Sequence, residues 1–200
     1  KKINNIKISY HTIKFWVQVK LEKIIELEHV YVKKDGNVIL DDISLSIYKN
    51  DFLALIGSNG SGKTTLLKVL AGVIKPNHGE IFLPSNNKNP KIGYLPQKIP
   101  VILNSPVTVR EIIETGINSS FIFSNDVSRE KIMKVSKDIG IDKSLDKKII
   151  ELSGGQIQLV FLARAIVDSP DIIILDEPSS SIDMKTQVKI FNILDILHRK

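Results

Sequence analysis

The chain has 200 residues and a formal net charge of +6, with 42% hydrophobic and 25% charged residues. This composition is ordinary for a globular protein and gives enough apolar surface for one or two domains with a sizeable core. The absence of cysteine excludes a disulfide framework and a thiolate metal site, and it fits a reducing compartment.

The chain also lacks the sequence features of a membrane or secreted protein. No apolar run approaches the roughly 20 residues of a membrane-spanning helix. Lys7, His11 and Lys14 interrupt the apolar stretch that a signal peptide would need. We therefore expect a soluble, cytosolic chain. Its lysines are scattered rather than striped, so the positive charge alone does not indicate nucleic acid or a membrane surface as a partner.

Residues 1–20 are an irregular mix of basic and apolar residues in which Phe15 and Trp16 are adjacent. An extra edge strand, a disordered leader and sequence foreign to the domain all fit this segment, so it is left unassigned. Regular hydrophobic periodicity begins only at Leu21.

From Leu21 onward the pattern is first that of β-strands. Alternation with period two predicts half-buried strands, and Asp35-Gly36-Asn37 predicts a turn between the first two of them. Residues 52–56 are apolar on both faces, which is typical of a central strand. The expected strands are 25–32, 43–48, 52–56, 80–83 and 91–95.

Helical periodicity dominates the second half of the chain. The expected helices are 63–71, 108–115, 128–140, 155–167 and 184–200. Residues 172–175 indicate a buried parallel strand. A helix after such a strand should cross over to another parallel strand, and none follows, so we expect the chain to stop before its domain is complete.

A glycine-rich segment between an apolar strand and a helix has the pattern of a P-loop, which binds the phosphates of a nucleotide. Its glycines allow backbone N–H groups to point at phosphate oxygens, aided by the positive end of the following helix. Lys63 is expected to reach the β- and γ-phosphates of a nucleoside triphosphate, Thr64 to offer its hydroxyl to Mg²⁺, and Thr65 to add a phosphate contact. The segment is Gly57, Ser58, Asn59, Gly60, Ser61, Gly62, Lys63 and Thr64.

Two carboxylates, Asp176 and Glu177, follow the buried strand 172–175. Ligands of open α/β sheets bind at the carboxyl ends of the strands. This position suits Asp176 to hold Mg²⁺ and Glu177 to act as general base on the attacking water. The plain alternative is an acidic cap at a strand-to-loop junction, and the P-loop upstream favours the catalytic interpretation.

A second glycine motif opens the helix expected after Gly155. Taken alone, it is a serine N-cap followed by a permissive Gly-Gly turn. One chain then has two helix N-termini suited to anions but one P-loop. The economical arrangement is a two-fold dimer in which each chain's second motif covers the nucleotide held by its partner. The motif is Leu152, Ser153, Gly154, Gly155 and Gln156.

These elements, in this order, resemble the nucleotide-binding domain of an ABC (ATP-binding cassette) ATPase over about residues 21–200. The match to the family's signature motif is complete, whereas Ser181 stands in the D-loop where alanine is common. The matching segments are residues 57–65 (Walker A), Gln97 (Q-loop), 152–156 (signature), 172–178 (Walker B with the catalytic glutamate) and 180–183 (D-loop).

The resemblance implies an α/β fold: a P-loop NTPase core of mostly parallel sheet flanked by helices, with an antiparallel β subdomain and an inserted helical subdomain. The implied divisions are 21–105 for the P-loop and β core, 106–150 for the helical subdomain, and 151–200 for the signature helix through the D-loop. The family's C-terminal strands would be missing.

The resemblance also implies a head-to-tail dimer, of two copies or of one copy with a paralogous ABC subunit, that holds two ATP molecules. Gln97 would act with Glu177 and Lys63 in catalysis, sense Mg²⁺ and link the core to the helical subdomain. That subdomain would dock a membrane-spanning permease, and Asp183 would signal between the two sites. The residues implied to bind the opposite chain's nucleotide are Ser153, Gly154, Gly155 and Gln156.

Two features depart from the family pattern. Lys34 occupies the position where an aromatic residue usually stacks on adenine, and Tyr31 lies nearby in the sequence. The family's switch histidine follows a later strand, beyond Lys200, and His198 is instead a solvated residue of the last helix. We therefore expect residues 1–200 alone to hydrolyse ATP poorly. The other histidines show no metal-ligand spacing.

The favoured function is an ATP-binding and hydrolysing subunit that powers transport through a separate permease, peripheral at the cytoplasmic face of the cell membrane. Residues 91–109 and the helical region resemble importer subunits, including those of zinc and manganese uptake. The alternative is a soluble ABC-type ATPase that acts on ribosomes or nucleic acid. Such proteins usually have two cassettes or a long coiled coil, and neither is visible, so nucleic acid is not an expected partner. A non-catalytic binding module is disfavoured because Lys63, Asp176 and Glu177 are all present.

Overall fold

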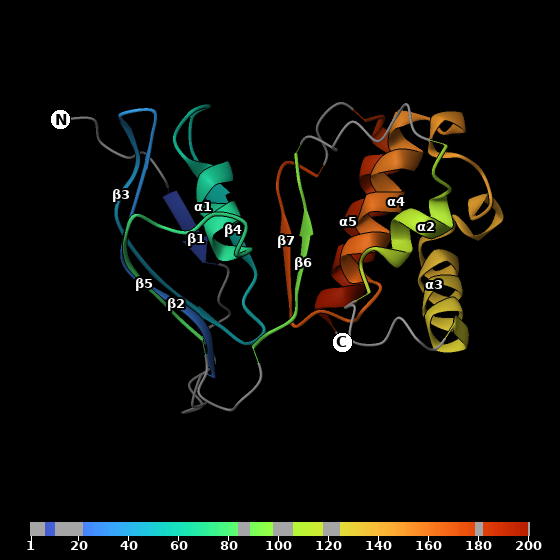
Figure 1. Cartoon of the computed structure of the whole chain (residues 1–200), viewed down its shortest axis with the longest axis horizontal. Helices are drawn as coiled ribbons and strands as arrows, with labels where there is room; N and C mark the ends of the chain where they lie inside the picture. Colours follow the sequence, from blue (N-terminus) through green and yellow to red (C-terminus); the bar gives the residue numbers. More distant parts are fainter. Residues whose placement is uncertain are drawn as a thin grey trace. The chain divides into compact units, whose positions relative to one another are not determined.

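The computed structural model describes residues 7–10, 22–83, 89–97, 106–117, 125–178 and 182–199. Its contacts divide the chain into two compact units, Lys1–Pro90 and Lys91–Lys200, and each is described by itself (Figure 1). The predicted strands and helices are all present, and most of their ends differ by at most three residues, but the strand predicted at 43–48 begins at Asn37. The predicted division near residue 105 falls among residues outside those described.

The first unit contains a three-stranded antiparallel sheet in the order β3-β2-β5. Strands β2 (Lys23–Lys34) and β3 (Asn37–Tyr48) form a hairpin, and β5 (His78–Phe82) pairs with the other edge of β2. The turn residues Asp35 and Gly36 have φ values of 50° and 77°. Two consecutive positive φ angles are typical of a type I′ turn, whose twist matches that of the flanking strands, so the predicted turn is confirmed.

Strand β4 (Leu53–Ile56) leads through the glycine-rich loop into α1 (Lys63–Leu70), which packs on β3. It pairs antiparallel with β1 (Lys7–Tyr10), so part of the unassigned leader forms an edge strand. The apolar run 52–56 predicted a central strand, whereas alternate residues of β4 are exposed in this structure and Ile56 is 56% exposed. Its hydrogen-bonded neighbour among the described residues is the short β1, which leaves much of its surface uncovered.

The second unit combines a parallel strand pair with helices (Figure 1). Strands β6 (Ile92–Leu95) and β7 (Ile172–Leu175) pair in parallel, as predicted for the buried strand. Helix α4 (Gly154–Ile166) contacts both β6 and α5 (Met184–His198). Because α4 lies against the strands on one side and other helices on the other, its residues 158–163 are all buried.

The inserted helical segment packs on α4. Helices α2 (Val109–Glu114) and α3 (Asn125–Ile139) contact α4 and each other. Two 3-10 turns, Asp142–Ser144 and Ile149–Glu151, then lead to the second glycine motif. One hydrophobic core joins all of these helices to β6. No helix in the described ranges is long and apolar enough to cross a membrane.

An ion-paired aspartate ties α3 to this core. Asp168 accepts hydrogen bonds from Lys131 Nζ (2.6 Å) on α3 and from Lys91 Nζ (2.8 Å) just before β6. Burial raises the pKa of Asp168, but the hydrogen bonds from the two lysines outweigh it and leave that pKa below its ordinary value. The carboxylate therefore stays charged and holds the helical segment beside the strand.

Candidate functional site

The P-loop lies in the first unit, between the end of β4 and the start of α1. Gly60 and Gly62 have φ values of 78° and 95°, in the left-handed region that favours glycine. A side chain at Gly62 would also approach the carbonyl oxygen of Ile39 to 2.9 Å. The loop is therefore curled closely against β3, and such curvature turns successive N–H groups toward one point.

Lys63 lies over this loop rather than out in solvent. Its ammonium Nζ donates to the carbonyl oxygens of Gly57 (2.8 Å) and Ser58 (2.9 Å). The N-cap residue of α1 is Gly62, which has no side chain to cap the helix, and the first turn contains no acidic residue. The loop thus combines one cation with uncapped N–H groups, which fits the charge and the acceptors of a triphosphate.

The remaining P-loop residues are exposed or half-buried. Ser58, Asn59 and Gly60 are exposed, and Gly57, Ser61, Lys63, Thr64 and Thr65 are half-buried. The Ser61 hydroxyl is buried and makes no hydrogen bond within the described part of the chain. Buried hydroxyls in proteins normally have a partner, so this one supports a ligand oxygen here.

Asp176 follows β7 in the second unit and is 2% exposed. Its N–H donates to the carbonyl oxygen of Leu95 (3.0 Å), which extends the β6–β7 pairing to the carboxylate. The pKa of the neighbouring Tyr94 phenol is raised, first by burial and second by the charge of Asp176. A carboxylate this deeply buried is costly without compensation, and a divalent cation is one form of it.

Glu177 is exposed, and its carboxylate accepts a hydrogen bond of 2.6 Å from Gln97 Nε2. The two residues are 80 positions apart in the sequence, and the parallel pairing of β6 with β7 brings them together. The backbone of Glu177 has a φ of 50°, a left-handed conformation that is uncommon for a residue other than glycine. The structure therefore brings together three predicted site residues, Gln97, Asp176 and Glu177, at one end of the strand pair.

The second glycine motif is anchored at one end and exposed in the middle. Leu152 is 9% exposed and belongs to the core of the second unit, whereas Ser153, Gly154 and Gln156 are exposed. Ser153 and Gln156 form a capping box: Ser153 Oγ accepts from the Gln156 N–H (3.3 Å), and Gln156 Oε1 accepts from the Ser153 N–H (2.9 Å). The motif thus presents its N-terminal turn in a fixed conformation.

The two glycines of this motif have different surroundings. A side chain on Gly155 would meet Thr186 Oγ1 at 2.8 Å and Asp183 Oδ2 at 3.2 Å, because α4 and α5 begin side by side. Asp183 caps α5 and accepts from the Thr186 N–H (3.0 Å) and hydroxyl (2.8 Å), which lowers its pKa. Gly154 has nothing within 4 Å of an added Cβ. Its lack of a side chain is therefore not required by contacts within the described residues.

Alanine substitutions should separate these two glycines. Gly155→Ala is expected to destabilise the second unit by roughly 1–3 kcal/mol, since the new methyl group overpacks the contact with Thr186. Gly154→Ala is expected to leave stability unchanged or raise it slightly, because nothing lies in its way and alanine favours a helix. Urea unfolding of both variants measures the difference, and equal losses of stability would contradict this account.

Sequence reasoning missed Gln158 and Thr186. Gln158 is 6% exposed on α4, and its Nε2 donates to the carbonyl oxygen of Pro178 (3.2 Å), next to Glu177. A polar residue directly before an apolar helical run was the available signal for it. No local signal marks Thr186, because its contact with Gly155 joins two different helices. Ser180 and Ser181 of the predicted D-loop lie outside the described residues.

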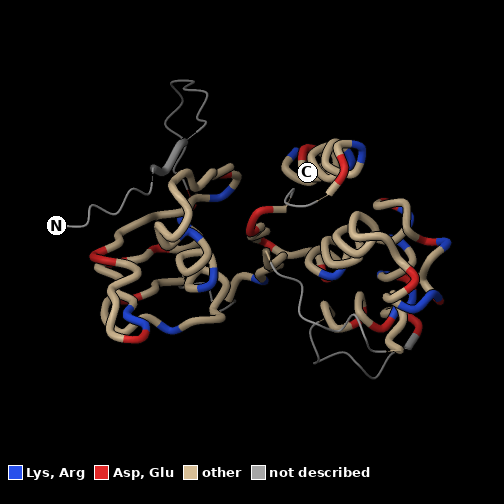
Figure 2. Tube along the Cα trace, turned by 90° about the horizontal axis from the view of Figure 1, so that it is seen from above, with Lys and Arg blue, Asp and Glu red and all other residues tan. Residues whose placement is uncertain are grey.

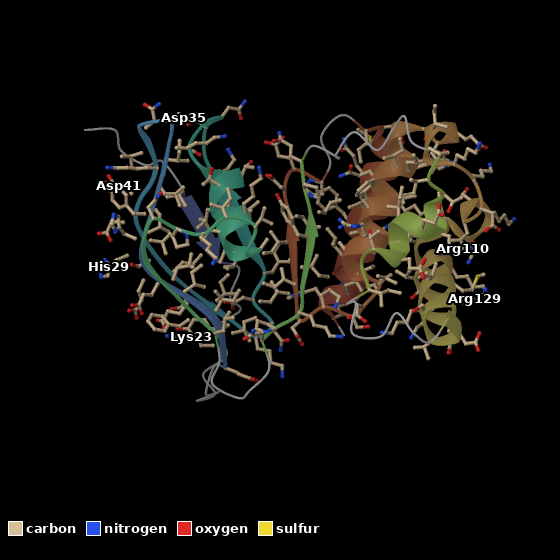
Figure 3. All side chains as sticks on the ribbon, in the orientation of Figure 1. Lys23, His29, Asp35, Asp41, Arg110 and Arg129 are labelled. Carbon is tan, nitrogen blue, oxygen red and sulfur yellow. The ribbon has the colours of Figure 1, made fainter. Side chains whose placement is uncertain are left out.

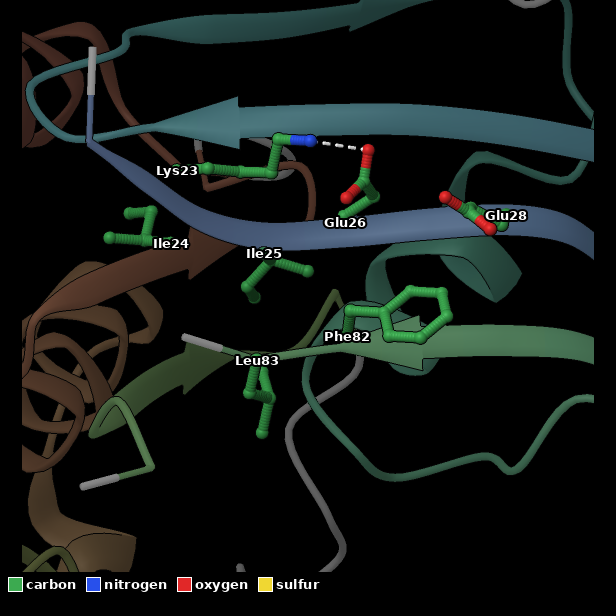
Figure 4. Close-up of a pocket in the computed structure, with 7 residues that line it drawn as sticks. All are labelled: Lys23, Ile24, Ile25, Glu26, Glu28, Phe82 and Leu83. Atoms are coloured by element: carbon green, nitrogen blue, oxygen red, sulfur yellow. Dashed lines mark hydrogen bonds and ion pairs between the residues drawn. The ribbon is translucent and has the colours of Figure 1, made fainter. Parts of the chain in front are cut away.

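Other polar features of the first unit do not resemble a nucleotide site. A pocket beside β2 and β5 is lined by Lys23, Ile24, Ile25, Glu26, Glu28, Phe82 and Leu83 (Figure 4). Its lysine is already paired with the Glu26 carboxylate, so the lining is acidic overall and unsuited to phosphate. Among the residues that the structure describes, basic and acidic ones are interspersed in each unit, without a basic stripe (Figure 2).

His29 and the two residues near the family's adenine position, Tyr31 and Lys34, all lie on β2. His29 projects outward from β2, where Nδ1 lies 2.6 Å from Asp42 Oδ1 and its pKa is raised by that bond (Figure 3). Across the described ranges no group of three metal-binding side chains could hold an ion. The Tyr31 phenol is hydrogen-bonded to Asp41, which raises its pKa, and Lys34 is exposed at the end of β2. The sequence assigns neither residue a stacking role.

The sequence of residues 40–180 matches the family model described as ABC transporter. The chain belongs to the ABC transporter family. The fold is accordingly that of a P-loop NTPase, and the resemblance seen in the sequence is confirmed. Within the family, such cassettes bind and hydrolyse ATP.

Similar curated proteins share one description. The chain is 36% identical over 177 residues to the zinc import ATP-binding protein ZnuC of Rickettsia conorii, covering 88% of this chain and 72% of that protein. It is 37% identical to the protein of the same name from Acinetobacter baylyi, covering 84% of this chain and 61% of that protein. The ZnuC of the Wolbachia of Brugia malayi is 32% identical over 200 residues, which span 100% of this chain and 73% of that protein.

Solved ABC cassettes have the same fold. An ABC transporter proposed to be of the metal-chelate type, in an inward-facing conformation, matches with a TM-score of 0.76 and 28% identity over 90% of this chain and 70% of that one. A dimeric bacterial ABC transporter cassette matches with a TM-score of 0.70 and 28% identity, covering 88% and 83% of the two chains. A dimeric cassette with ADP and phosphate, in a post-hydrolysis state, has a TM-score of 0.71 and 28% identity over 88% and 83%.

Proposed function

We propose that this chain is the ATP-hydrolysing subunit of a zinc importer and works as a dimer with a separate membrane permease. The observation that carries the ATPase assignment is the 2.6 Å hydrogen bond between Gln97 and Glu177 next to the buried Asp176. The zinc assignment is supported by the relatives, which are named as zinc import ATP-binding proteins.

The P-loop is proposed to bind the triphosphate of ATP. Lys63 neutralises charge on the β- and γ-phosphates, while the N–H groups of the loop and of the first turn of α1 donate to phosphate oxygens. Thr64 and Thr65 begin α1 and are half-buried, so their hydroxyls can contribute there. The other phosphate-binding residues are Gly57, Ser58, Asn59, Gly60, Ser61 and Gly62.

The polar residues at the end of the strand pair are proposed to carry the chemistry. The Glu177 carboxylate takes a proton from the attacking water as the water oxygen bonds to the γ-phosphorus, and the bond to the bridging oxygen breaks to release ADP and phosphate. Gln97 fixes the orientation of that carboxylate through their hydrogen bond. Thr64, Gln97 and Asp176 are the proposed Mg²⁺ ligands. When bound, the ion would supply positive charge to the phosphate oxygens.

The exposed turn of the signature motif is proposed to act on the nucleotide of the partner subunit. Ser153 and Gly154 are exposed at the N-terminus of α4, and Gly154 leaves room for a close approach from outside. A helix N-terminus attracts phosphate, and a glycine without internal contacts permits a ligand to reach its N–H group. Gln156 is also exposed and holds this turn in shape through the capping box, while Gly155, which is proposed to take part with them, is buried beneath the turn against Thr186.

The location is proposed to be cytoplasmic, at the inner face of the cell membrane, where the helical subdomain meets the permease. The solved dimeric cassettes, at 28% identity, support pairing with a second copy or a paralogous subunit. The alternative of a soluble ATPase acting on ribosomes or nucleic acid has less support, because charges are interspersed and the named relatives are transport proteins.

Reconstitution into proteoliposomes with its cognate permease and binding protein tests this function. We expect ATP-dependent accumulation of radioactive zinc, abolished when the subunit carries Lys63→Ala. Parallel assays with manganese and iron control for metal selectivity. Accumulation of manganese without zinc would contradict zinc as the transported metal. Zinc uptake that does not depend on ATP would contradict the proposed role of this subunit in powering transport.

A further inference from the structure

Gln158 is a polar residue on the buried side of α4. It is 6% exposed, and the following residues of the helix, 159–163, are buried and apolar. A buried amide is costly unless it is hydrogen-bonded. Its Nε2 donates to the carbonyl oxygen of Pro178, 3.2 Å away. That acceptor is on the residue directly after Glu177.

The backbone at Glu177 needs support from its surroundings. Its φ of 50° is uncommon for a non-glycine residue, and such conformations persist where neighbouring contacts enforce them. On the upstream side, the N–H of Asp176 is bonded to β6. The side chain of Glu177 is held by Gln97 (2.6 Å), and the downstream carbonyl of Pro178 is held by Gln158 (3.2 Å). Together these contacts hold the backbone on both sides of Glu177, the residue in the left-handed conformation.

We infer that Gln158 is a positioning residue for the general base. Its hydrogen bond fixes the carbonyl of Pro178 to α4 and thereby holds the backbone of Glu177 in the conformation that sets the direction of its carboxylate. Gln158 touches none of the reacting atoms and acts through Glu177. This inference rests on the proposed role of Glu177 in ATP hydrolysis.

The same contact links two different motifs. Gln158 lies two residues after Gln156, within the first turns of the helix that the signature motif opens. A short helix moves as one body, so a shift of the signature turn is transmitted to Pro178. In the proposed head-to-tail dimer, the signature motif serves one ATP and Glu177 of the same chain acts on the other. Gln158 therefore couples occupancy of one site to the base of the other.

The test compares Gln158→Met with the unchanged protein in the reconstituted transporter. Methionine has a similar length but no donor, so the Pro178 carbonyl loses its partner. The kcat for ATP hydrolysis is expected to fall roughly 10- to 100-fold, as small misplacements of catalytic groups do. The KM and the Kd for ATP should change by less than about twofold, because ground-state binding does not involve this contact.

Thr115→Val is the matched control in the same unit. It removes the hydrogen bond from Thr115 Oγ1 to the Ile112 carbonyl (2.7 Å) and the acceptor for Arg164 Nε (2.7 Å), away from the motifs. Both variants should lower Tm, but Thr115→Val should retain kcat. An equal loss of kcat in the two variants would show that Gln158 has a merely structural role and would overturn the inference.

A double variant separates this inference from the proposed function. In a Glu177→Gln background, Gln158→Met should cause no further loss of the residual turnover, since its effect passes through Glu177. A multiplicative loss would overturn the inference. If Glu177→Gln alone leaves turnover unchanged, the proposed function fails instead. Should Gln158→Met not fold, Gln158→Leu, which suits the apolar surroundings, is read by the same criteria.

Discussion

The Glu177→Gln variant is expected to bind ATP with unchanged affinity and to hydrolyse it roughly 10²- to 10⁴-fold more slowly, the usual contribution of a general base. An amide has the size of the carboxylate but cannot accept a proton from water. Glu177 is exposed, and the amide oxygen of glutamine can still accept the hydrogen bond from Gln97 Nε2, so the exchange should cost little stability. Phosphate release, ATP titration and thermal unfolding of the same preparation measure the three quantities.

The matched control is Glu114→Gln, the same change at an exposed glutamate at the end of α2. It should retain full turnover. A second consequence concerns assembly: blocked hydrolysis should let ATP accumulate in the sandwiched state, so the Glu177→Gln dimer should persist in ATP on a sizing column. Turnover within a factor of two of the unchanged protein would exclude Glu177 as the base.

Lys63→Ala should have the second large effect, on binding rather than on chemistry. Removing one partner of a buried, hydrogen-bonded charge pair typically costs roughly 2–5 kcal/mol. For the Lys63 contact with the phosphates this corresponds to a rise in the ATP Kd of roughly 30- to 4,000-fold. Isothermal titration calorimetry with ATP measures the Kd directly.

The folded protein should tolerate Lys63→Ala. The loop carbonyls of Gly57 and Ser58 that the ammonium contacts are near solvent and can bind water instead. Lys68→Ala, in the last turn of the same helix, controls for the loss of positive charge on α1 and should leave the Kd unchanged. Retained ATP affinity in Lys63→Ala, or an equal loss in Lys68→Ala, would contradict the phosphate role.

Elements defined by local chemistry could be predicted well. Asp35-Gly36 adopts positive φ angles because an Asp-Gly pair tolerates them, and the hairpin follows from the alternation on either side. The apolar run 172–175 forms β7 with the predicted ends. Ser153 caps α4 as its sequence context requires, since both bonds of a capping box lie within four residues.

Features that depend on distant parts of the chain could not be predicted. The apolar run 52–56 indicated a strand but not the neighbours of that strand. The exposure of alternate residues in β4 therefore could not be predicted. The link between Gln158 and Pro178 spans 20 positions, and the contact between Gly155 and Thr186 joins two helices. Neither pairing has a local pattern, because side chains meet there only after the helices have packed.

The sequence by itself determined the family, the order of the motifs and the residues able to bind phosphate, because glycine spacing and residue type express local backbone and chemical requirements. Only the tertiary structure decided how Glu177 is held. The parallel pairing of β6 with β7 places Gln97 beside the Glu177 carboxylate, and the packing of α4 places Gln158 beside the carbonyl of Pro178. The signature motif that opens α4 is thereby tied to the proposed base through one buried amide, a connection that exists only once the helix and the strand pair share a core.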